Sequence, residues 1–313
     1  MKHLFIINPA AGSRDRTEHY RKEIARVCDP KGLDYRIHVS AAPGDCRTAA
    51  IAAAQTGEEY RIYACGGDGT LNEVVSGVAG YPNAAVTAYQ GGSGNDFIKI
   101  FDEPDAFKDL ERLLDCKEVD LDLIKCNDDY CLNICSVGLD ARIGTDVSNY
   151  KRLPLLTGFR AYAVSTLFNV IKGISEHYVV KIGDETVDAR QTMICVCNGR
   201  WYGGSFNPCP DAEPDDGLLD ILLVKPVNLL QVAMVIGKYQ KGQYANYPHL
   251  LRHFRSDHVK ITCFEDSVVN LDGESLRTQE VTFAVSSHKL RFFYPAGLQY
   301  RCAVSNSEEI GVI

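Results

Sequence analysis

The sequence predicts two units of different fold class, a doubly wound α/β unit followed by a mainly antiparallel β-sandwich. At 313 residues the chain is too long for one typical domain and fits two, each large enough to bury a core. Up to about residue 115, short apolar runs alternate with helix-period segments, whereas beyond about residue 126 apolar residues recur at every second position. Glycine-rich turns follow the early apolar runs, where strands would end.

The first unit begins as an alternating series of strands and helices. We expect them, in turn, over Leu4–Ile7, Thr17–Cys28, Tyr35–Ser40, Asp45–Gln55 and Ile62–Cys65, then a strand over Ala85–Tyr89 and a helix over Ala106–Asp115. Such alternation is typical of a mostly parallel sheet with helices on both faces. In these sheets ligands lie beyond the carboxyl ends of the strands, so the turns after several strands should meet at one cleft.

The turn Gly66–Asn72 is the strongest functional signal in this unit. Its sequence, Gly-Gly-Asp-Gly-Thr-Leu-Asn, stands between an apolar run and a helix-period segment, which is the pattern of a strand, a tight turn and a helix start. The glycines let backbone N–H groups approach a ligand, and the helix N-terminus adds partial positive charge, so phosphate is the expected ligand. The turn is not a Walker loop, because no Lys-Ser or Lys-Thr follows, and it is not a Gly-x-Gly-x-x-Gly motif.

Two further turns should face the same cleft. In Asn8–Ser13, proline fixes the chain and Gly12 permits close approach, although an ordinary loop explains this stretch equally well. The stretch Gln90–Phe97 is again glycine-rich and, with the preceding glycine turn, could clasp opposite sides of a polyphosphate. Ser93 offers a hydroxyl there, and Asp96 offers a carboxylate that could hold a magnesium-bound water or orient a reacting hydroxyl. The alternative for Asp96 is a helix N-cap.

The second unit is predicted from apolar residues at every second position. Strands are expected over Cys131–Cys135, Tyr178–Ile182, Thr192–Cys197, Leu218–Val224, Val259–Cys263 and Val281–Val285, with helices at about Gly158–Lys172 and Leu229–Lys238. Many short strands separated by turn signals predict an antiparallel sandwich. No repeat or low-complexity linker separates the units, so the division into residues 1–125 and 126–294 rests on the change of pattern.

Two turns of the second unit carry acids that could do chemistry. Tyr202–Gly217 is a long loop fixed by prolines and glycines, and Asp216 near its end could bind a divalent ion together with backbone carbonyls. A plain Asp-Gly turn into a strand is the alternative. In the stretch Asn270–Glu274, Asp272 and Glu274 flank one glycine. They could place a general base at the cleft, or they could simply belong to a hairpin turn.

Composition and charge exclude several classes of function. The formal net charge is -8, so the chain has no general basic field and binding to nucleic acid is not expected. The N-terminal apolar run spans only Leu4–Ile7 and no apolar segment is long enough to cross a bilayer, which predicts a soluble, cytosolic protein without a transmembrane segment. Several of the 12 cysteines lie in apolar strand patterns without metal-ligand spacing, which favours reduced, buried thiols.

Together, these motifs resemble those of the bacterial diacylglycerol kinase-like lipid kinases, which share the catalytic domain of diacylglycerol, sphingosine and ceramide kinases. The resemblance covers nearly the whole chain, and the motifs stand in the family's order: Asn8-Pro9-x-x-Gly12, Gly66–Glu73, Gly92–Asp96, Asp120, Asn133 with Gly138, Gly203–Gly217 and Leu271–Glu274. It implies an ATP-binding α/β domain, a β-sandwich domain and an active site between them. It also implies that the last segment, about 295–313, packs back on the first domain.

The same resemblance implies roles for individual residues. The residues implied to hold ATP are Asn8, Pro9, Gly12, Ser40, Gly66, Gly67, Asp68, Gly69, Thr70, Leu71, Asn72, Ser93, Gly94 and Asn95. Those implied to hold magnesium are Asp216 with the carbonyls of Glu213 and Leu218, and an acidic network of Asp68, Asp96 and Asp120. Glu274, beside Asp272, matches the proton acceptor. Serine stands at positions 40 and 93 where the family often has threonine, which keeps the hydroxyl.

The activity implied by the resemblance is an ATP- and magnesium-dependent lipid kinase that phosphorylates a lipid hydroxyl, foremost that of diacylglycerol, giving phosphatidic acid. Another lipid alcohol such as a sphingoid base, an NAD kinase, and a non-catalytic ATP- or lipid-binding protein stay open as alternatives. The protein would be cytoplasmic and would meet its lipid at the inner membrane face, and a homodimer also stays open. Apolar and basic residues between Lys151 and Tyr162 could form a lipid entry or a helix packed on the sandwich.

Overall fold

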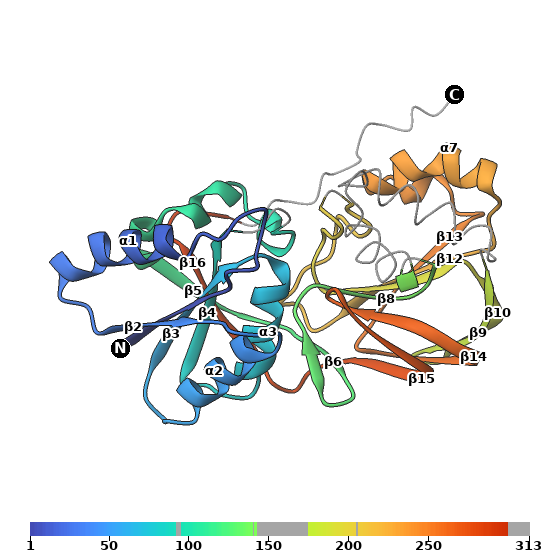
Figure 1. Cartoon of the computed structure of the whole chain (residues 1–313). Helices are drawn as coiled ribbons and strands as arrows, with labels where there is room; N and C mark the ends of the chain where they lie inside the picture. The colour runs from blue at the N-terminus through green and yellow to red at the C-terminus, as the bar shows by residue number, and fades with distance from the viewer. Residues whose placement is uncertain (92–94, 140, 143–174, 205, 300–313) are drawn as a thin grey trace.

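The computed structural model describes residues 1–91, 95–139, 141–142, 175–204 and 206–299. Two units lie side by side: the N-terminal part of the chain forms a sheet flanked by helices, and most of the remaining chain forms an antiparallel β-sandwich (Figure 1). The predicted fold class is therefore confirmed. Within the described ranges, no helix is both long and apolar enough to cross a bilayer.

The first unit is built on a six-stranded, mostly parallel sheet. In spatial order it contains β2 (Tyr35–Val39), β1 (Lys2–Ile7), β3 (Tyr60–Gly66), β4 (Ala84–Gln90), β16 (Leu290–Pro295) and β5 (Cys116–Leu121). Neighbouring strands pair in parallel, except that β5 is antiparallel to β16. The register aligns Ile7 with Cys65 and Gly66 with Gln90. The three glycine-containing turns after β1, β3 and β4 therefore leave the sheet at the same edge.

Helices cover the two faces of this sheet. On one face α2 (Asp45–Ala54) packs against α3 (Asp68–Val78), and on the other lie α1 (Thr17–Cys28) and the short α4 (Leu110–Leu114) (Figure 1). The helix predicted over residues 106–115 is divided instead into a 3₁₀ turn, Pro104–Lys108, and α4. The break lies at Asp109, which is extended and whose carboxylate accepts the N–H groups of Glu111 and Arg112. Asp109 thus caps the start of α4.

β16 returns from the far end of the chain into the first unit, where it separates β4 from β5. Its residues Phe292 and Phe293 are fully buried, and the Phe293 ring packs edge-on against the Tyr63 ring with centroids 5.0 Å apart. The returning strand begins at Leu290. The predicted returning segment was 295–313, of which residues 300–313 lie outside the described ranges.

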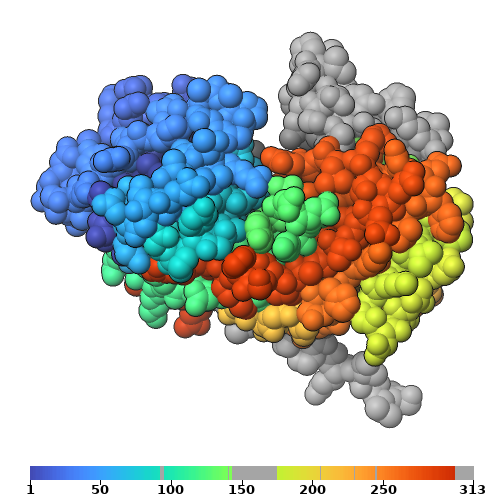
Figure 2. Space-filling view, turned by 90° about the horizontal axis from the view of Figure 1, so that it is seen from below, coloured from blue at the N-terminus to red at the C-terminus, as the bar shows by residue number. Residues whose placement is uncertain are grey.

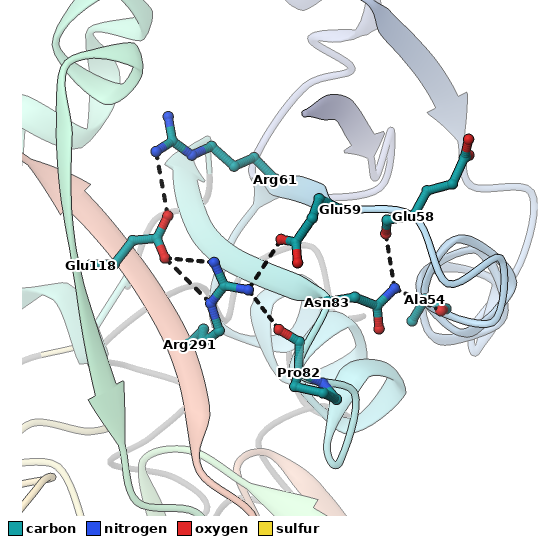
Figure 3. A network of polar contacts seen from close by, with 8 residues as sticks. All are labelled: Ala54, Glu58, Glu59, Arg61, Pro82, Asn83, Glu118 and Arg291. Carbon is teal, nitrogen blue, oxygen red and sulfur yellow. Dashed lines mark hydrogen bonds and ion pairs between the residues drawn. The ribbon is translucent and has the colours of Figure 1, made fainter.

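A polar network fixes one end of β16. The Arg291 guanidinium donates to Glu118 on β5 at 2.8 Å, to Glu59 at 3.2 Å and to the Pro82 carbonyl at 2.5 Å (Figure 3). Arg61 on β3 donates to the other oxygen of Glu118 at 3.3 Å. One guanidinium from the end of the chain therefore bonds to three segments of the first unit.

The second unit contains a ten-stranded antiparallel sheet that folds over into the two layers of a sandwich. Its main path runs through β13 (Leu251–Ser256), β12 (Leu219–Val224), β11 (Met193–Cys197), β8 (Ile134–Gly138), β14 (His258–Leu271), β15 (Glu274–Val285), β6 (Ile124–Cys126) and β7 (Asp129–Cys131), with β9 (Glu176–Ile182) and β10 (Glu185–Gln191) beside β14. The register of β14 shifts between Thr262 and Ser267. Its first half pairs with β9 and its second half with β8, so one strand belongs to both layers.

The core of the second unit lies between these layers and contains buried side chains such as Val137, Ile221, Val259 and Phe283. The outer face of β11 and β12 is covered by α7 (Leu229–Gln240), which confirms the helix predicted over Leu229–Lys238. Cysteines such as Cys135 and Cys195 are buried among apolar side chains, as the strand patterns predicted. The helix predicted at residues 158–172 lies outside the described ranges.

Candidate active site

The turn between β3 and α3 is held by the two turns beside it. The Asn8 side-chain amide donates to the Thr70 hydroxyl at 3.1 Å, and the Gly91 N–H donates to the Gly66 carbonyl at 2.8 Å. Gly12 adopts φ +82°, and a Cβ there would lie 3.1 Å from the Gly91 carbonyl oxygen. The three predicted turns are therefore in direct contact, and they pack so closely that a side chain at Gly12, Gly66 or Gly91 would interfere with a neighbour.

The N-terminus of α3 presents backbone N–H groups without a side-chain cap. Gly67 is the N-cap residue, and no described side chain accepts from the first turn. The first N–H groups of any α-helix have no partner within the helix, so those at the start of α3 are left for a ligand. A helix start of this kind binds anions, because the orphan donors and the helix dipole act together. Asn72, one turn further, is almost fully buried, and its Oδ1 has no hydrogen-bond partner among the described residues.

The remaining residues that were predicted to bind the nucleotide fall into three groups. Ser40 joins β2 to β1 through its N–H, which donates to the Ile7 carbonyl at 2.8 Å, so its hydroxyl stands at the same edge of the sheet. Leu71 is buried in the core, which gives it a packing role. Asn95 is buried with φ +48°, whereas Ser93 and Gly94 lie outside the described residues.

Asp68 and Asp96 form an acidic pair at this turn. The N–H of Asp96 donates to Asp68 Oδ1 at 2.5 Å, which brings the two carboxylates close. Burial, reinforced by the neighbouring charge of Asp96, raises the pKa of Asp68 to about 6. A buried acidic pair is a favourable environment for a divalent cation, because a cation removes the repulsion between the carboxylates.

Asp96 also joins the two units. Its Oδ2 accepts the N–H of Gly204 at 2.7 Å, and its Oδ1 is bound by Lys99, whose ammonium also donates to the Gly204 carbonyl at 2.7 Å. The alternative role as a helix N-cap is wrong for the side chain, which caps nothing although Asp96 precedes the 3₁₀ turn Phe97–Ile100. Its carboxylate instead holds the loop of the second unit against the first.

The hairpin between β14 and β15 separates the roles of the two predicted catalytic acids. Asp272 accepts three backbone N–H groups, from Leu132 at 2.8 Å, Asn133 at 2.9 Å and Ile134 at 2.7 Å. Burial raises the pKa of Asp272 to about 6, although these three donors act in the opposite direction. Glu274 lies two residues further along and is exposed. Asp272 therefore fixes the hairpin, while the Glu274 carboxylate is accessible.

Both units line a polar cleft that contains Glu274. The first unit contributes Gly44, Arg47, Asn72, Glu73 and Ser76, and the second contributes Asp129, Tyr130, Cys131, Leu271 and Glu274. Arg47 on α2 forms an ion pair with Asp129 on β7 at 2.9 Å, and the Ser76 hydroxyl on α3 donates to the Tyr130 carbonyl at 2.6 Å. Figure 2 shows the β6–β7 hairpin, in green, wedged between the first unit and the β14–β15 strands. Sequence reasoning missed Arg47, because a single arginine on a helix gives no local signal.

A second residue missed from the sequence is Asp122. It is fully buried just after β5, accepts the Gly217 N–H at 2.8 Å and is bound by Lys289. Asp120, the acid predicted for the metal network, is exposed on β5 opposite Arg291 in the strand register. The sequence signal for Asp122 is its position between two leucines. Leu121 and Leu123 are both fully buried, so the carboxylate between them needs partners inside the protein.

The loop before β12 holds the predicted metal residues. Asp216 Oδ1 accepts the Leu218 N–H at 2.9 Å, and its other oxygen is bound by Arg255. Burial and the nearby charges of Glu213, Asp216 and Asp122 raise the pKa of Asp215, so negative charge is concentrated here. A carboxylate and carbonyl oxygens are donors that magnesium prefers, and the crowded acids favour a cation. Among the described residues, however, no three His, Cys, Asp or Glu side chains gather as a ready ligand set.

The fold and this cleft define a class of protein, a two-unit kinase with glycine turns in an α/β unit and acids in a β-sandwich. Residues 2–126 match the family described as "Diacylglycerol kinase catalytic domain", and residues 133–294 match that described as "YegS C-terminal NAD kinase beta sandwich-like domain". The chain therefore belongs to the diacylglycerol kinase-like family of lipid kinases, as the motifs predicted.

Individual relatives agree with this family. A protein named diacylglycerol kinase from Bacillus subtilis (strain 168) is 26% identical over 275 residues, which cover 86% of this chain and 88% of that protein. The crystal structure of a diacylglycerol kinase from Bacillus anthracis matches with a TM-score of 0.67 at 20% identity, covering 94% of this chain and 97% of that chain. Another solved structure from the same organism reaches 0.73 at 23% identity, with the same coverage. At these identities the solved structures support the fold alone.

Proposed function

We propose that this lipid kinase transfers the γ-phosphate of ATP to a lipid hydroxyl in a magnesium-dependent reaction, with diacylglycerol as the acceptor and phosphatidic acid as the product. The observation that carries the proposal is the arrangement of the cleft: Asn72, one turn into α3 from its uncapped N-terminus, lines the same space as Glu274. Phosphoryl transfer depends mainly on positioning and charge neutralisation, so backbone donors and accessible acids are sufficient protein groups.

In this proposal the first unit binds the nucleotide. The N–H groups at the start of α3 bind phosphate oxygens, while Asn8 and Gly12 hold the adjoining turns in place. Asn72 Oδ1 is an acceptor that has no partner in the described chain, so it is free to receive a ligand donor. Ser40 stands at the same edge of the sheet, where its hydroxyl reaches the nucleotide.

Two groups of acids would hold magnesium. The pKa of Asp68 is raised and the Asp96 N–H donates to its carboxylate, an arrangement that favours a cation beside the phosphates. Asp216, with the carbonyls of Glu213 and Leu218, has the oxygen donors for a separate structural ion, and there Arg255 would share or yield the carboxylate. Magnesium, when bound, neutralises charge on the phosphate groups.

Glu274 is the proposed proton acceptor. Its carboxylate is exposed and lines the cleft, whereas the oxygens of Asp272 are occupied by three backbone donors. A general base must reach the hydroxyl proton that it abstracts, which favours the accessible acid. Asp272 acts as a positioning residue, because it ties the hairpin that carries Glu274 to the segment Leu132–Ile134.

The acceptor and the site of action follow from the class of substrate. A lipid hydroxyl is met at a membrane surface, so we propose a cytoplasmic protein that binds the inner membrane face peripherally. Sphingoid bases and NAD are the acceptors to compare with diacylglycerol, the latter because the matched sandwich family carries NAD kinase in its description.

The test is a transfer assay with γ-labelled ATP, magnesium and separate diacylglycerol, sphingoid and NAD acceptors. We expect label in phosphatidic acid, and none when EDTA removes the metal. Label that appears in the sphingoid base or in NAD instead would reassign the substrate. Label in none of the acceptors, with ATP still bound in calorimetry, would contradict the proposal and indicate a binding protein.

A further inference from the structure

Helix α7 is apolar on two sides, and only one of them is covered. Val232, Val235 and Tyr239 face the sandwich and pack over the outer face of β11 and β12. On the opposite side Leu230 is 69% exposed and Met234 is 61% exposed. A helix that is apolar all round is normally buried, so the exposed side of α7 is expected to have a partner.

The exposed residues form one continuous stripe. Leu230, Ala233, Met234 and Gly237 are all exposed and follow the spacing i, i+3, i+4, i+7 of a single helix face. The helix begins with a capping box, in which the Asn228 side chain accepts the Gln231 N–H and the Gln231 side chain accepts the Asn228 N–H. The stripe is therefore formed by the folded protein itself and needs no ordering when a partner binds.

The sequence around α7 lacks acidic residues. The formal net charge of the protein is -8, yet residues 221–256 contain no aspartate or glutamate. Lys238 and Lys241 continue the exposed stripe at the C-terminal end of the helix, at spacings of eight and eleven from Leu230. Neither lysine forms an ion pair with a described residue. An apolar stripe that ends in unpaired lysines is complementary to an anionic lipid surface.

We propose that the exposed face of α7 docks the enzyme on anionic phospholipid bilayers. The apolar stripe enters the boundary between head groups and acyl chains, and Lys238 and Lys241 bind the anionic head groups. The proposal rests on the function proposed above, because a lipid acceptor brings the enzyme to a membrane. The occupant of the face is thus a bilayer, and a second copy of the chain is the alternative to be tested.

Phe264 on β14 provides a matched comparison. It is 65% exposed, about as much as Leu230 and Met234, but Glu265 and Asp266 follow it directly and its ring contacts only His177 among the aromatic groups of the described chain. The carboxylates of Glu265 and Asp266 are repelled by an anionic surface and keep this apolar side chain away from it. Substitution at Phe264 therefore controls for the loss of an exposed apolar group as such.

The experiment measures sedimentation of the full chain with vesicles of phosphatidylcholine, alone or mixed with phosphatidylglycerol. We expect the wild type to bind the anionic vesicles. Met234→Glu should weaken binding by about tenfold or more, because one apolar side chain is lost and a like charge is added. The double variant K238Q/K241Q should lose about fivefold per charge removed. Phe264→Glu should bind as the wild type does.

Other readouts separate this proposal from its alternatives. If the Met234→Glu variant binds anionic vesicles as tightly as the wild type, docking through α7 is wrong. If light scattering shows that Met234→Glu turns a dimer into a monomer while vesicle binding persists, a second copy covers the face and the proposal is equally wrong. Thermal unfolding that matches the wild type shows that the variants are folded.

The failure of docking and the failure of the proposed function are distinguishable. Vesicle sedimentation needs no turnover, whereas a short-chain, water-soluble diacylglycerol tests turnover without vesicles. We expect Met234→Glu to phosphorylate the short-chain lipid at the wild-type rate and to lose activity only on vesicles. An equal loss on both substrates would contradict the docking role.

Discussion

The two walls of the cleft are built from different parts of the polypeptide. In the first unit the wall adjoins a backbone surface: the glycine turns after β1, β3 and β4 contact one another, and the start of α3 exposes N–H groups one helical turn from Asn72, which lines the cleft. The wall in the second unit is side chain: Glu274 extends from a hairpin that Asp272 ties down. The spacing of glycines along the sequence therefore predicts the first wall. The second wall depends on contacts between distant segments, because these contacts decide which carboxylate stays accessible.

The largest effect is expected for Glu274→Gln. If Glu274 takes the proton from the acceptor hydroxyl, turnover should fall by roughly 10² to 10⁴. ATP affinity should be retained, because the proposed phosphate site is at the start of α3 and not at Glu274. Single-turnover kinetics and calorimetry with ATP measure the two quantities separately. Wild-type turnover by this variant would remove Glu274 from the mechanism.

Asp272→Asn should lower the stability of the protein, whereas Glu274→Gln should not. Asparagine tolerates the left-handed backbone of this position, φ +48°, about as well as aspartate does, so backbone strain is not introduced. The new amide group would face backbone N–H donors, and a buried donor left without an acceptor costs about 1–3 kcal/mol. Urea denaturation should show this loss for Asp272→Asn and none for Glu274→Gln. Equal stability of both variants would mean that the hairpin is held by other contacts.

The backbone wall is tested by two glycine substitutions. A Cβ on Gly66 would lie 2.2 Å from Thr70 Oγ1, so Gly66→Ala should displace Thr70 and cost roughly 1–3 kcal/mol of stability. A Cβ on Gly69 would meet nothing within 4 Å, so Gly69→Ala should leave the melting temperature unchanged or slightly raised. Weaker ATP binding by a fully stable Gly69→Ala variant would indicate that the start of α3 touches the phosphates. Unchanged ATP binding would argue against that contact.

A further effect is a dependence of stability on pH. The pKa of Asp272 is raised to about 6 from an ordinary value of 3.8, so the fold favours its protonated form. The stabilisation is fully present below pH 3.8 and is lost as pH rises through 6, on the order of 3 kcal/mol. The pKa of Asp68 is also raised to about 6. Because Asp68 is present in both proteins, its contribution cancels when the wild type is compared with Asp272→Asn. A difference that grows with pH would mean that the backbone donors outweigh burial.

Much of the fold follows from local patterns. Alternating apolar runs and amphipathic segments predicted β1, α1, β2, α2 and β3 because each element buries one face or both. The predicted helix at residues 106–115 is broken because the Asp109 carboxylate accepts the backbone N–H groups of Glu111 and Arg112 in the first turn of α4. Helix propensities summed over the segment do not predict this local hydrogen bonding. The position of β16 between β4 and β5 has no local signal, since its partners lie far away in the sequence.

The candidate site was also predictable from the sequence only in part. The glycine turns were predicted because tight strand-to-helix turns require those residues locally. Asp272 and Glu274 could not be separated, because the N–H groups that bind Asp272 come from Leu132 to Ile134, about 140 residues earlier. Asp120 and Asp122 also look alike in sequence, and only the second lies at the buried junction with the loop before β12.

The return of β16 has a consequence for how the chain is made. Until residue 295 has left the ribosome, the place between β4 and β5 is empty and the edge of β4 stays unpaired. An unpaired strand edge is a template for aggregation. The first unit therefore completes its sheet only after the whole sandwich has been synthesised, and a gene truncated after the first unit should yield insoluble protein although it encodes every glycine turn.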